Sequence, residues 1–436
     1  MKHVVLFAGL AAMFCGPAAA MHYDVAVGIR PEARRLDATV IIRDPPADRF
    51  VLHKDFVVQS VIADGKPAQF HVDASQKASP FTPTGAVVVV EAKGAKVVEI
   101  RYGGTVDKTI AGVNMITPGL VELAIPLAWY PFFSMAHDYT FRLTAALPEG
   151  LKVASNGKAL SQSTSNGRAT FVWTSYEPTF DIALVAAPGM HTTAAGSPRV
   201  EIDYATLPAA LMGAQRDALI RARSRLVALY GEPRAKTGLQ VFFAPRRGYP
   251  YSRAPLVLTS EGYVAKDLGN SEIENFRHTA HELAHHWWIL APAVNDDDWT
   301  NNCEAWINEG LAEYSALRLV QAEYGEAAAG KILEQYRQEA AHGKTSDAIA
   351  ETKQNSPDFF LNRYKKASLM LFAAREKFGG DRIDALLRSL YKRYAGTHLA
   401  TTKAFLELAG NEMGAEAAAF FQDELYRRPK APEARQ

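Results

Sequence analysis

The hydrophobic pattern of this 436-residue chain changes its period near residue 205. Between residues 22 and about 190, short β-branched and aromatic runs such as Val87–Glu91 alternate with Asn-Gly and Asp-Gly pairs. Such runs bounded by turn residues are typical of strands. The segment Pro208–Gly231 instead repeats its apolar residues at helical spacing, with a proline near its start and a glycine at its end. The chain is therefore predicted to fold as an all-β part followed by a mostly helical part.

The helical part is expected to open with two strands and to continue as a series of helices. The strands are expected at Leu239–Pro245 and Pro255–Ser260. The helices are expected at about 273–290, 304–323, 326–342, 362–378, 381–394 and 401–409. We expect a β-rich saddle or sandwich domain at 21–195, an α+β domain at 196–428, and a disordered tail at 429–436.

The first twenty residues have the pattern of a secretory signal peptide. Lys2 precedes an apolar run of about ten residues, and small residues lead to a cleavage site after Ala20. The run is shorter than the roughly 20 residues that span a bilayer. We therefore expect a secreted or periplasmic protein without stable membrane insertion. If Cys15 leaves with the leader, Cys303 has no partner and the mature chain holds no internal disulfide. The alternative of a lipid anchor at Cys15 is disfavoured, because Phe14 before it is a poor lipobox residue.

Charge gives no indication of a polyanionic partner. The formal net charge is +1, 22% of the residues are charged, and no long block carries one sign. Nucleic acid and anionic membranes are therefore not expected as partners. The sequence does not determine the oligomeric state.

The stretch HELAHHWW, His281–Trp288, is the strongest functional signal. His281 and His285 are four residues apart, so a helix presents both imidazoles on one face, where they can bind one zinc ion. Glu282 points in a neighbouring direction and could take a proton from a water activated by the metal. The nearby His278 and His286 are not expected to be ligands.

A catalytic zinc ion usually has three protein ligands and one open position. The third ligand is expected from a second helix, and the downstream segment Cys303–Tyr314 offers Glu304, Glu309 and Glu313.

The sequence around these glutamates resembles that of the gluzincin zinc aminopeptidases of the membrane alanyl aminopeptidase type. This family includes the leukotriene-epoxide hydrolases. In that family HExxH is followed, eighteen residues later, by a ligand glutamate within a W-L-N-E-G-F-A segment. Spacing would select Glu304, whereas the segment Trp306–Ala312 selects Glu309. We prefer Glu309, because a linker lengthens at little entropic cost, whereas five positions on a helix differ by about 140°.

The resemblance extends to other segments. Pro148–Leu160 looks like the family's strand and S-N-G turn, and Arg363–Ala367 resembles its Y-E-K-G segment. There the tyrosine, here Tyr364, would donate a hydrogen bond to the oxyanion of the intermediate. Glu313, one turn after Glu309, is either an acceptor for the second N–H of a ligand histidine or an exposed carboxylate.

The chain also departs from the family. Tyr251–Leu256 occupies the place of the G-x-M-E-N segment, whose glutamate grips the free α-amine of the substrate, and it contains no glutamate. Arg253 stands there instead. We also expect no counterpart of the large C-terminal helical domain of many family members, and hence a more open cleft.

The resemblance therefore implies a thermolysin-like catalytic domain behind the β domain, with one Zn²⁺ held by His281, His285 and Glu309. The expected function is hydrolysis of peptide substrates by a metal-activated water, with Glu282 as general base and with aminopeptidase-like specificity. Two alternatives stay open: a non-catalytic binding module on this fold, and a zinc hydrolase of a non-peptide substrate such as an epoxide or ester.

Overall fold

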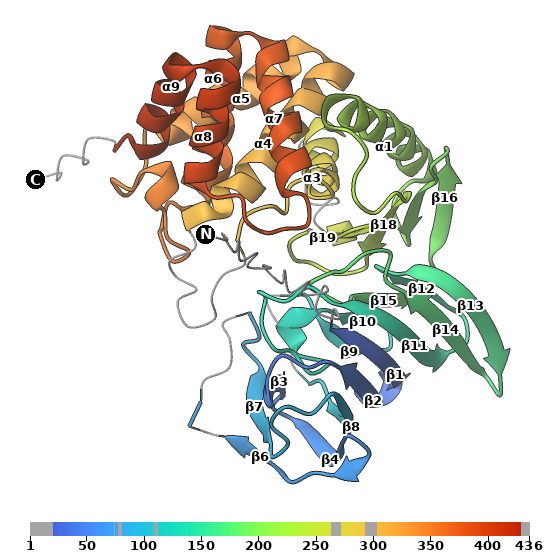
Figure 1. Ribbon diagram of the computed structural model, residues 1–436. Helices are drawn as coiled ribbons and strands as arrows, with labels where there is room; N and C mark the ends of the chain where they lie inside the picture. The colour runs from blue at the N-terminus through green and yellow to red at the C-terminus, as the bar shows by residue number, and fades with distance from the viewer. Residues whose placement is uncertain are drawn as a thin grey trace, which may run out of the picture.

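The computed structural model describes residues 21–428, except 74, 77–80, 108, 110–111, 263–271 and 293–302. Figure 1 shows the helices on the upper side and most strands on the lower side, with β16, β18 and β19 next to α1 and α3. The expected leader and tail lie outside the described residues, so cleavage, secretion and tail disorder stay predictions. Among the helices of the described part, none combines the length and apolar character that crossing a membrane requires.

The largest sheet of the N-terminal half has eight strands in the order β13-β14-β11-β1-β2-β8-β4-β5. These strands are β1 (His22–Arg30), β2 (Arg35–Arg43), β4 (Phe56–Ala63), β5 (Lys66–Pro67), β8 (Val97–Thr105), β11 (Thr140–Pro148), β13 (Lys158–Ser165) and β14 (Arg168–Thr174). β1 runs parallel to β11 and antiparallel to β2. Every second side chain of β1 and β2 is buried, which is the alternation that a sheet with one covered face requires.

Two smaller sheets complete this half. One has the order β3-β7-β6 and the other β12-β15-β10-β9. Their strands are β3 (Arg49–His53), β6 (Phe70–Asp73), β7 (Gly85–Val90), β9 (Met115–Thr117), β10 (Leu120–Leu123), β12 (Leu151–Ser155) and β15 (Leu184–Pro188). Residues of all three sheets share one hydrophobic core. The short helical turns η1 (Pro31–Ala33) and η2 (Ile125–Leu127) join strands of this half.

The C-terminal half opens with a mixed sheet of order β16-β17-β18-β20-β19. Its strands are β16 (His191–Ala195), β17 (Val200–Tyr204), β18 (Leu239–Ala244), β19 (Tyr251–Arg253) and β20 (Leu256–Ser260). The parallel pair β17 and β18 is connected by the long helix α1 (Ala209–Tyr230). The expected domain boundary at 195–196 lies between β16 and β17. β19 forms the edge of the sheet and lies below α3 (Glu272–Ala284) in Figure 1.

The remaining helices surround α3. They are α4 (Trp306–Tyr324), α5 (Glu326–Ala340), α6 (Ala367–Phe378), α7 (Gly380–Tyr394), α8 (Thr402–Met413) and α9 (Ala415–Tyr426), with 3₁₀ turns η4 (Cys303–Ala305) and η5 (Ile349–Glu351) and the π-helical segment η6 (Leu361–Lys366). The sequence did not predict α9. It also placed the end of α3 near residue 290, whereas the helix ends at Ala284 because its last turn tightens. There the amides of His286 and Trp287 donate to carbonyls only three residues back.

The two halves are held together by apolar and ionic contacts. Strands β12 and β15 of the first half share a core with β18 and β20 of the second. Next to this core, Arg246 Nε lies 2.5 Å from Glu122 Oε2, and the Tyr251 hydroxyl donates to Glu122 Oε1 at 2.9 Å. Both charged side chains are buried, so the ion pair lacks water to compete with it. The fold class predicted from the sequence, a β-rich domain followed by a mostly helical α+β domain, is confirmed.

Candidate active site

The two histidines of HELAHHWW lie together at the end of α3. Their ring centroids are 4.8 Å apart and the rings are nearly perpendicular. His281 Nε2 and His285 Nε2 lie 3.4 Å and 3.3 Å from the same carboxylate oxygen of Glu309, on α4. One ligand atom from each of the three residues therefore lies within 4.8 Å of the other two. The structure brings together the three residues that the sequence proposed as metal ligands.

The other ring nitrogens decide whether these atoms can bind a metal. His281 Nδ1 lies 2.8 Å from Glu313 Oε2, and His285 Nδ1 lies 3.2 Å from the backbone oxygen of Trp288. A carbonyl oxygen only accepts hydrogen bonds, so Nδ1 of His285 carries a proton. In both rings Nε2 is then the nitrogen left to offer a lone pair toward Glu309. Two imidazoles and one carboxylate that converge in this way fit a zinc ion.

The electrostatics of the cluster favour a positive charge at this point. Burial lowers the pKa of His281, but hydrogen bonds with Glu309 and Glu313 outweigh it and raise the pKa to about 10. Burial raises the pKa of Glu309, but His285 and His281 outweigh it and hold this pKa well below its usual value. The carboxylates thus stabilise added positive charge between the rings, which a proton or a metal ion can supply.

Glu313 is buried and contacts His281 at Nδ1, the ring nitrogen that faces away from Glu309. Its Oε1 accepts hydrogen bonds from Arg277 Nη1 and from the Tyr336 hydroxyl, both at 2.6 Å, while Oε2 accepts from His281. Of the two roles that the sequence left open for Glu313, the structure favours the acceptor, because the side chain is only 2% exposed. The arrangement fixes both the tautomer and the orientation of the His281 ring.

Gly310, the residue after Glu309, lets α4 approach the segment that carries Tyr364. A Cβ atom at Gly310 would lie 2.5 Å from the Cβ of Ala367 and 3.0 Å from the Arg363 carbonyl oxygen, which are both too close. The π-helical turn of η6 places the Tyr364 ring on the His281 ring, with centroids 5.5 Å apart and planes within 13°. Burial, and then Glu309, raise the pKa of Tyr364 well above its usual value, so its hydroxyl keeps its proton.

The structure also separates Glu304 from Glu309. Glu304 Oε2 accepts hydrogen bonds from the amide and the hydroxyl of Thr402, both at 2.6 Å, at the start of α8. It therefore stabilises a helix N-terminus rather than approaching the histidines. Asn308, which the sequence interpretation did not single out, accepts the amides of Leu290 and Ala291 at 2.9 Å and ties the chain after α3 to α4.

Glu282 lines the same cleft as Glu309 and Tyr364. Burial raises the pKa of its carboxyl group above the usual value for glutamate, and the two neighbouring histidines partly oppose this shift. A carboxylate with a raised pKa is a stronger base than an ordinary surface glutamate. Its placement beside the three candidate ligands suits the predicted role of general base.

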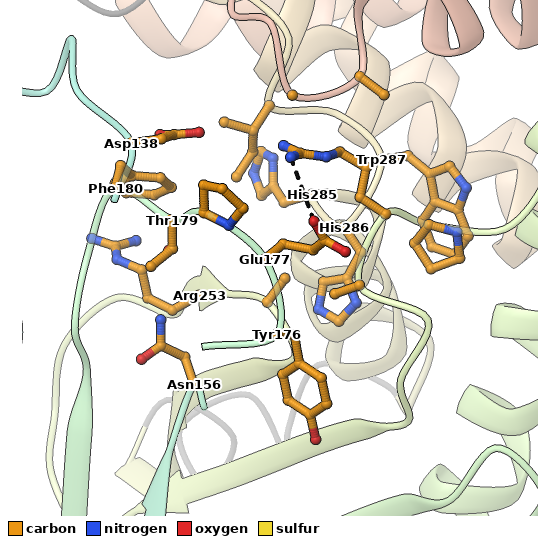
Figure 2. Close-up of a pocket in the computed structure, with 18 of the residues that line it drawn as sticks. Asp138, Asn156, Tyr176, Glu177, Thr179, Phe180, Arg253, His285, His286 and Trp287 are labelled. Atoms are coloured by element: carbon orange, nitrogen blue, oxygen red, sulfur yellow. Dashed lines mark ion pairs between the residues drawn. The ribbon is translucent and has the colours of Figure 1, made fainter. Parts of the chain in front are cut away.

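The two remaining histidines of the segment lie elsewhere. His278 Nε2 lies 2.7 Å from Arg277 Nη2, and burial lowers the pKa of His278 to about 3. His286 points away from His285, into the pocket drawn in Figure 2, and burial lowers its pKa to about 3 as well. Neither belongs to the set of ligand atoms described above, as the sequence predicted.

Two adjoining cavities lead to the candidate metal site. The larger one, of about 870 Å³, is lined by the three candidate ligands, by Glu282 and Tyr364, and by side chains of the N-terminal half such as Met135. The smaller one, of about 110 Å³, is shown in Figure 2. Both cavities include Phe180, Arg253, His285, Ile289 and His398 in their walls, so substrate can reach the site between the two halves.

The sequence interpretation missed several residues of the site. Arg277 lies one turn before His281 on α3, so helical periodicity could have placed it on the ligand face. Tyr336 reaches Glu313 from α5, and Asp181 reaches Arg253 from the N-terminal half. No local pattern marks these two residues, because they meet their partners only when distant segments pack together.

The comparisons with known proteins agree with this geometry. Residues 255–423 match the family model of the Peptidase family M1 domain. Residues 255–423 are therefore identified as a peptidase family M1 domain. The family resemblance predicted from the HExxH and Asn308-Glu309-Gly310 segments is confirmed. No curated protein matches the chain in sequence.

Solved structures show that the fold extends beyond the M1 domain. An M1 zinc metallopeptidase from Deinococcus radiodurans is 21% identical, with a TM-score of 0.72 and 95% of each chain covered. A mutant of that enzyme bound to a Tyr-Ser-Ala substrate has a TM-score of 0.73 at 21% identity, covering 95% of this chain and 96% of that one. Native yeast LTA4 hydrolase is 16% identical with a TM-score of 0.69, covering 96% of this chain and 69% of that one. At these identities the likeness is one of fold.

The Glu313–His281 hydrogen bond generates a testable prediction. Replacing Glu313 by Gln exchanges a charged acceptor for a neutral one, so we expect affinity for Zn²⁺ to fall by about 10–100-fold. Competition with a chromophoric chelator measures the affinity. Glu304→Gln is the matched control, because it weakens the start of α8 and should leave zinc affinity as in wild type. Equal affinity in Glu313→Gln and wild type would show that the contact does not support the site.

Proposed function

We propose that this chain is a zinc-dependent peptidase that binds one Zn²⁺ through His281, His285 and Glu309. The observation that carries the proposal is the convergence of three ligand atoms whose two imidazoles have their other nitrogens occupied. The match of residues 255–423 to the Peptidase family M1 domain supports peptide hydrolysis. The similar fold from Deinococcus radiodurans belongs to a zinc metallopeptidase, which supports the choice of metal.

When bound, a zinc ion supplies Lewis acidity, which polarises a carbonyl oxygen and makes water more acidic. The residues of the chain supply the proton transfers and orientation. Glu282 takes the proton of the attacking water on its carboxylate and then delivers this proton to the nitrogen of the leaving amine. The raised pKa of Glu282 suits both steps, since the group must hold the proton between them.

Tyr364 is proposed to stabilise the negative charge that forms on the former carbonyl oxygen of the scissile peptide bond. Its ring is fixed against His281, and its raised pKa keeps the hydroxyl protonated as a donor. A donor held in place before the reaction stabilises charge that appears only in the transition state, and it pays no reorganisation cost. Phe359 and Phe360 line the same cleft as Tyr364.

Specificity for a free N-terminus would require a carboxylate in the cleft that is available to the substrate ammonium group. Among the described residues that line the large cleft, the carboxylates are Glu282, Glu309 and Glu313. The first is proposed as the base, the second as a ligand, and the third is held by Arg277. These residues therefore offer no uncommitted carboxylate to a substrate ammonium group, and aminopeptidase-like specificity stays a prediction.

The role of Glu282 is tested by Glu282→Gln. The amide cannot take up a proton, so we expect kcat to fall by about 10²–10⁴-fold while one zinc ion per chain is retained. Digestion of a broad peptide library gives the rate, and elemental analysis gives the zinc content. Full activity in this variant would refute the mechanism. Zinc binding by the wild type without cleavage of any peptide would instead favour the non-catalytic binding module.

The role of Tyr364 is tested by Tyr364→Phe, which removes one hydroxyl and keeps the ring on His281. We expect kcat to fall by about 10²–10³-fold with little change in KM or zinc affinity, because the hydrogen bond forms in the transition state. Steady-state kinetics on one cleaved peptide separates the two constants. A change confined to KM would assign Tyr364 to ground-state binding.

The predicted exopeptidase specificity is tested with paired peptides that differ only in a free or acetylated N-terminus. An enzyme that grips the α-amine must lose most of its kcat/KM on acetylation, whereas the cleft described above predicts similar values for both members of a pair. Mass spectrometry of the products identifies the bond that is cut. Cleavage of the free peptides alone, one residue at a time from the N-terminus, would restore the aminopeptidase interpretation.

A further inference from the structure

Arg253 occupies the wall that the two cavities share. It is the last residue of β19, the edge strand beside α3, and its side chain lines both the large cleft and the smaller pocket. Figure 2 shows its guanidinium group next to Phe180, on the side of the pocket opposite Trp287. His285 contributes to the same shared wall. A cation therefore stands beside the candidate metal site, within the space open to substrate.

The guanidinium group is fixed on three sides. Its Nε donates to Asp181 Oδ2 at 2.5 Å and its Nη1 donates to the Ser252 carbonyl oxygen at 2.8 Å. Its central carbon lies 4.8 Å from the Phe180 ring centroid and 5.0 Å from that of Tyr251. Within the described part of the chain, Nη2 has no hydrogen-bond partner. A planar donor held in this way loses little further entropy when it binds an anion.

Arg253 is not the only hydrogen-bond donor to Asp181. This buried carboxylate also accepts the amide of Ile125, at 3.1 Å and 3.2 Å from its two oxygens, and the hydroxyl of Tyr130 at 3.1 Å. Its negative charge is thus shared among donors of the N-terminal half. The ion pair with Asp181 leaves Nη2 of Arg253 available to donate to a second acceptor.

The other cations of the cleft are differently placed. Arg277 donates to Glu274 and Glu313 through all three of its nitrogens, and Lys365 is paired with Glu339. Among the arginines and lysines that line the cleft in the described residues, Arg253 is the one with a nitrogen that lacks a protein acceptor. Nη2 of Arg253 is thus a position in the cleft where a negatively charged group of the substrate finds a charged donor.

We propose that Arg253 binds a carboxylate of the substrate and so makes the enzyme selective for acidic peptides. The carboxylate comes from an aspartate or glutamate side chain near the scissile bond, or from the C-terminus of a short peptide. This inference rests on the proposed peptidase function and names the substrate class of the same site. A charge-assisted hydrogen bond from a fixed guanidinium to a carboxylate gives the selectivity.

Matched peptides test the proposal on the zinc-loaded enzyme. In one set, a single glutamate is moved through each position on either side of the scissile bond and compared with glutamine at the same position. In a second set, each peptide ends in a carboxylate or in an amide, which distinguishes the two sources of the charge. We expect kcat/KM to be higher for the acidic member by about tenfold or more at one position. Ratios near one in both sets would overturn the inference.

Variants then assign the preference to Arg253. Arg253→Gln should bring the ratio of acidic to neutral substrate close to one. Because it leaves Asp181 buried without its cation, the double variant Arg253→Gln with Asp181→Asn provides a neutral buried pair, and it should show the same loss of preference. A preference that persists in both variants would overturn the inference.

Lys152→Gln is the matched control. Lys152 pairs across the two halves with Glu201 at 2.8 Å and with the buried Asp203 at 3.1 Å, but it does not line either cavity. This variant also removes an interdomain cation from a buried carboxylate, and it should keep the acidic preference. If the wild type cleaves no peptide at all, the proposed function fails. If it cleaves acidic and neutral peptides equally, the function stands and the role of Arg253 fails.

Discussion

The hydrogen bond between His281 and Glu313 is the contact on which the rest of the site depends. It occupies the inner nitrogen of the ring and turns the outer nitrogen toward Glu309. The carboxylate that makes this contact is itself held by Arg277 and Tyr336, which come from α3 and α5. His281 and Glu309 therefore lie on two packed helices, α3 and α4, and His285 follows in the turn directly after α3. The orientation of the His281 ring is set before any ion binds.

The second constraint is the fixed relation between the two halves of the chain. The shared core of β12, β15, β18 and β20 and the buried pair of Glu122 and Arg246 hold the N-terminal sheets against the five-stranded sheet. This contact determines which residues of the N-terminal half reach the cleft. Asp181 is one of them, and it holds Arg253 beside the candidate metal site. Substrate selection and catalysis are thus proposed to use residues from both halves, with the N-terminal half acting through Arg253.

Much of the site could be predicted because its signals are local. Helical spacing alone predicted that His281 and His285 share one face next to Glu282, and the two imidazoles do lie together in the structure. The same spacing links Glu309 to Glu313. The choice between Glu304 and Glu309 needed the family resemblance, because linker length does not determine which helical residue faces a metal. In the structure the Glu309 carboxylate faces both histidines, whereas the Glu304 carboxylate accepts hydrogen bonds from Thr402.

Long-range pairing explains most of what the sequence did not reveal. β1 pairs with β11, which lies more than a hundred residues away along the chain. The alternation of apolar and polar residues predicts a strand but does not indicate which strand it pairs with. Arg253 was visible as a departure from the family, but its partner Asp181 and its aromatic neighbours were not, since they come from a different half. The early end of α3 was missed because the aromatic run after His285 continues the apolar pattern in a tightened turn.

Anomalous X-ray scattering at the zinc absorption edge, from crystals of the purified protein, tests the central claim most directly. The account predicts one strong peak per chain, about 2.0–2.2 Å from Nε2 of His281, Nε2 of His285 and a carboxylate oxygen of Glu309. A zinc-replete crystal with no peak between these three atoms, or with its peak on other residues, would contradict it.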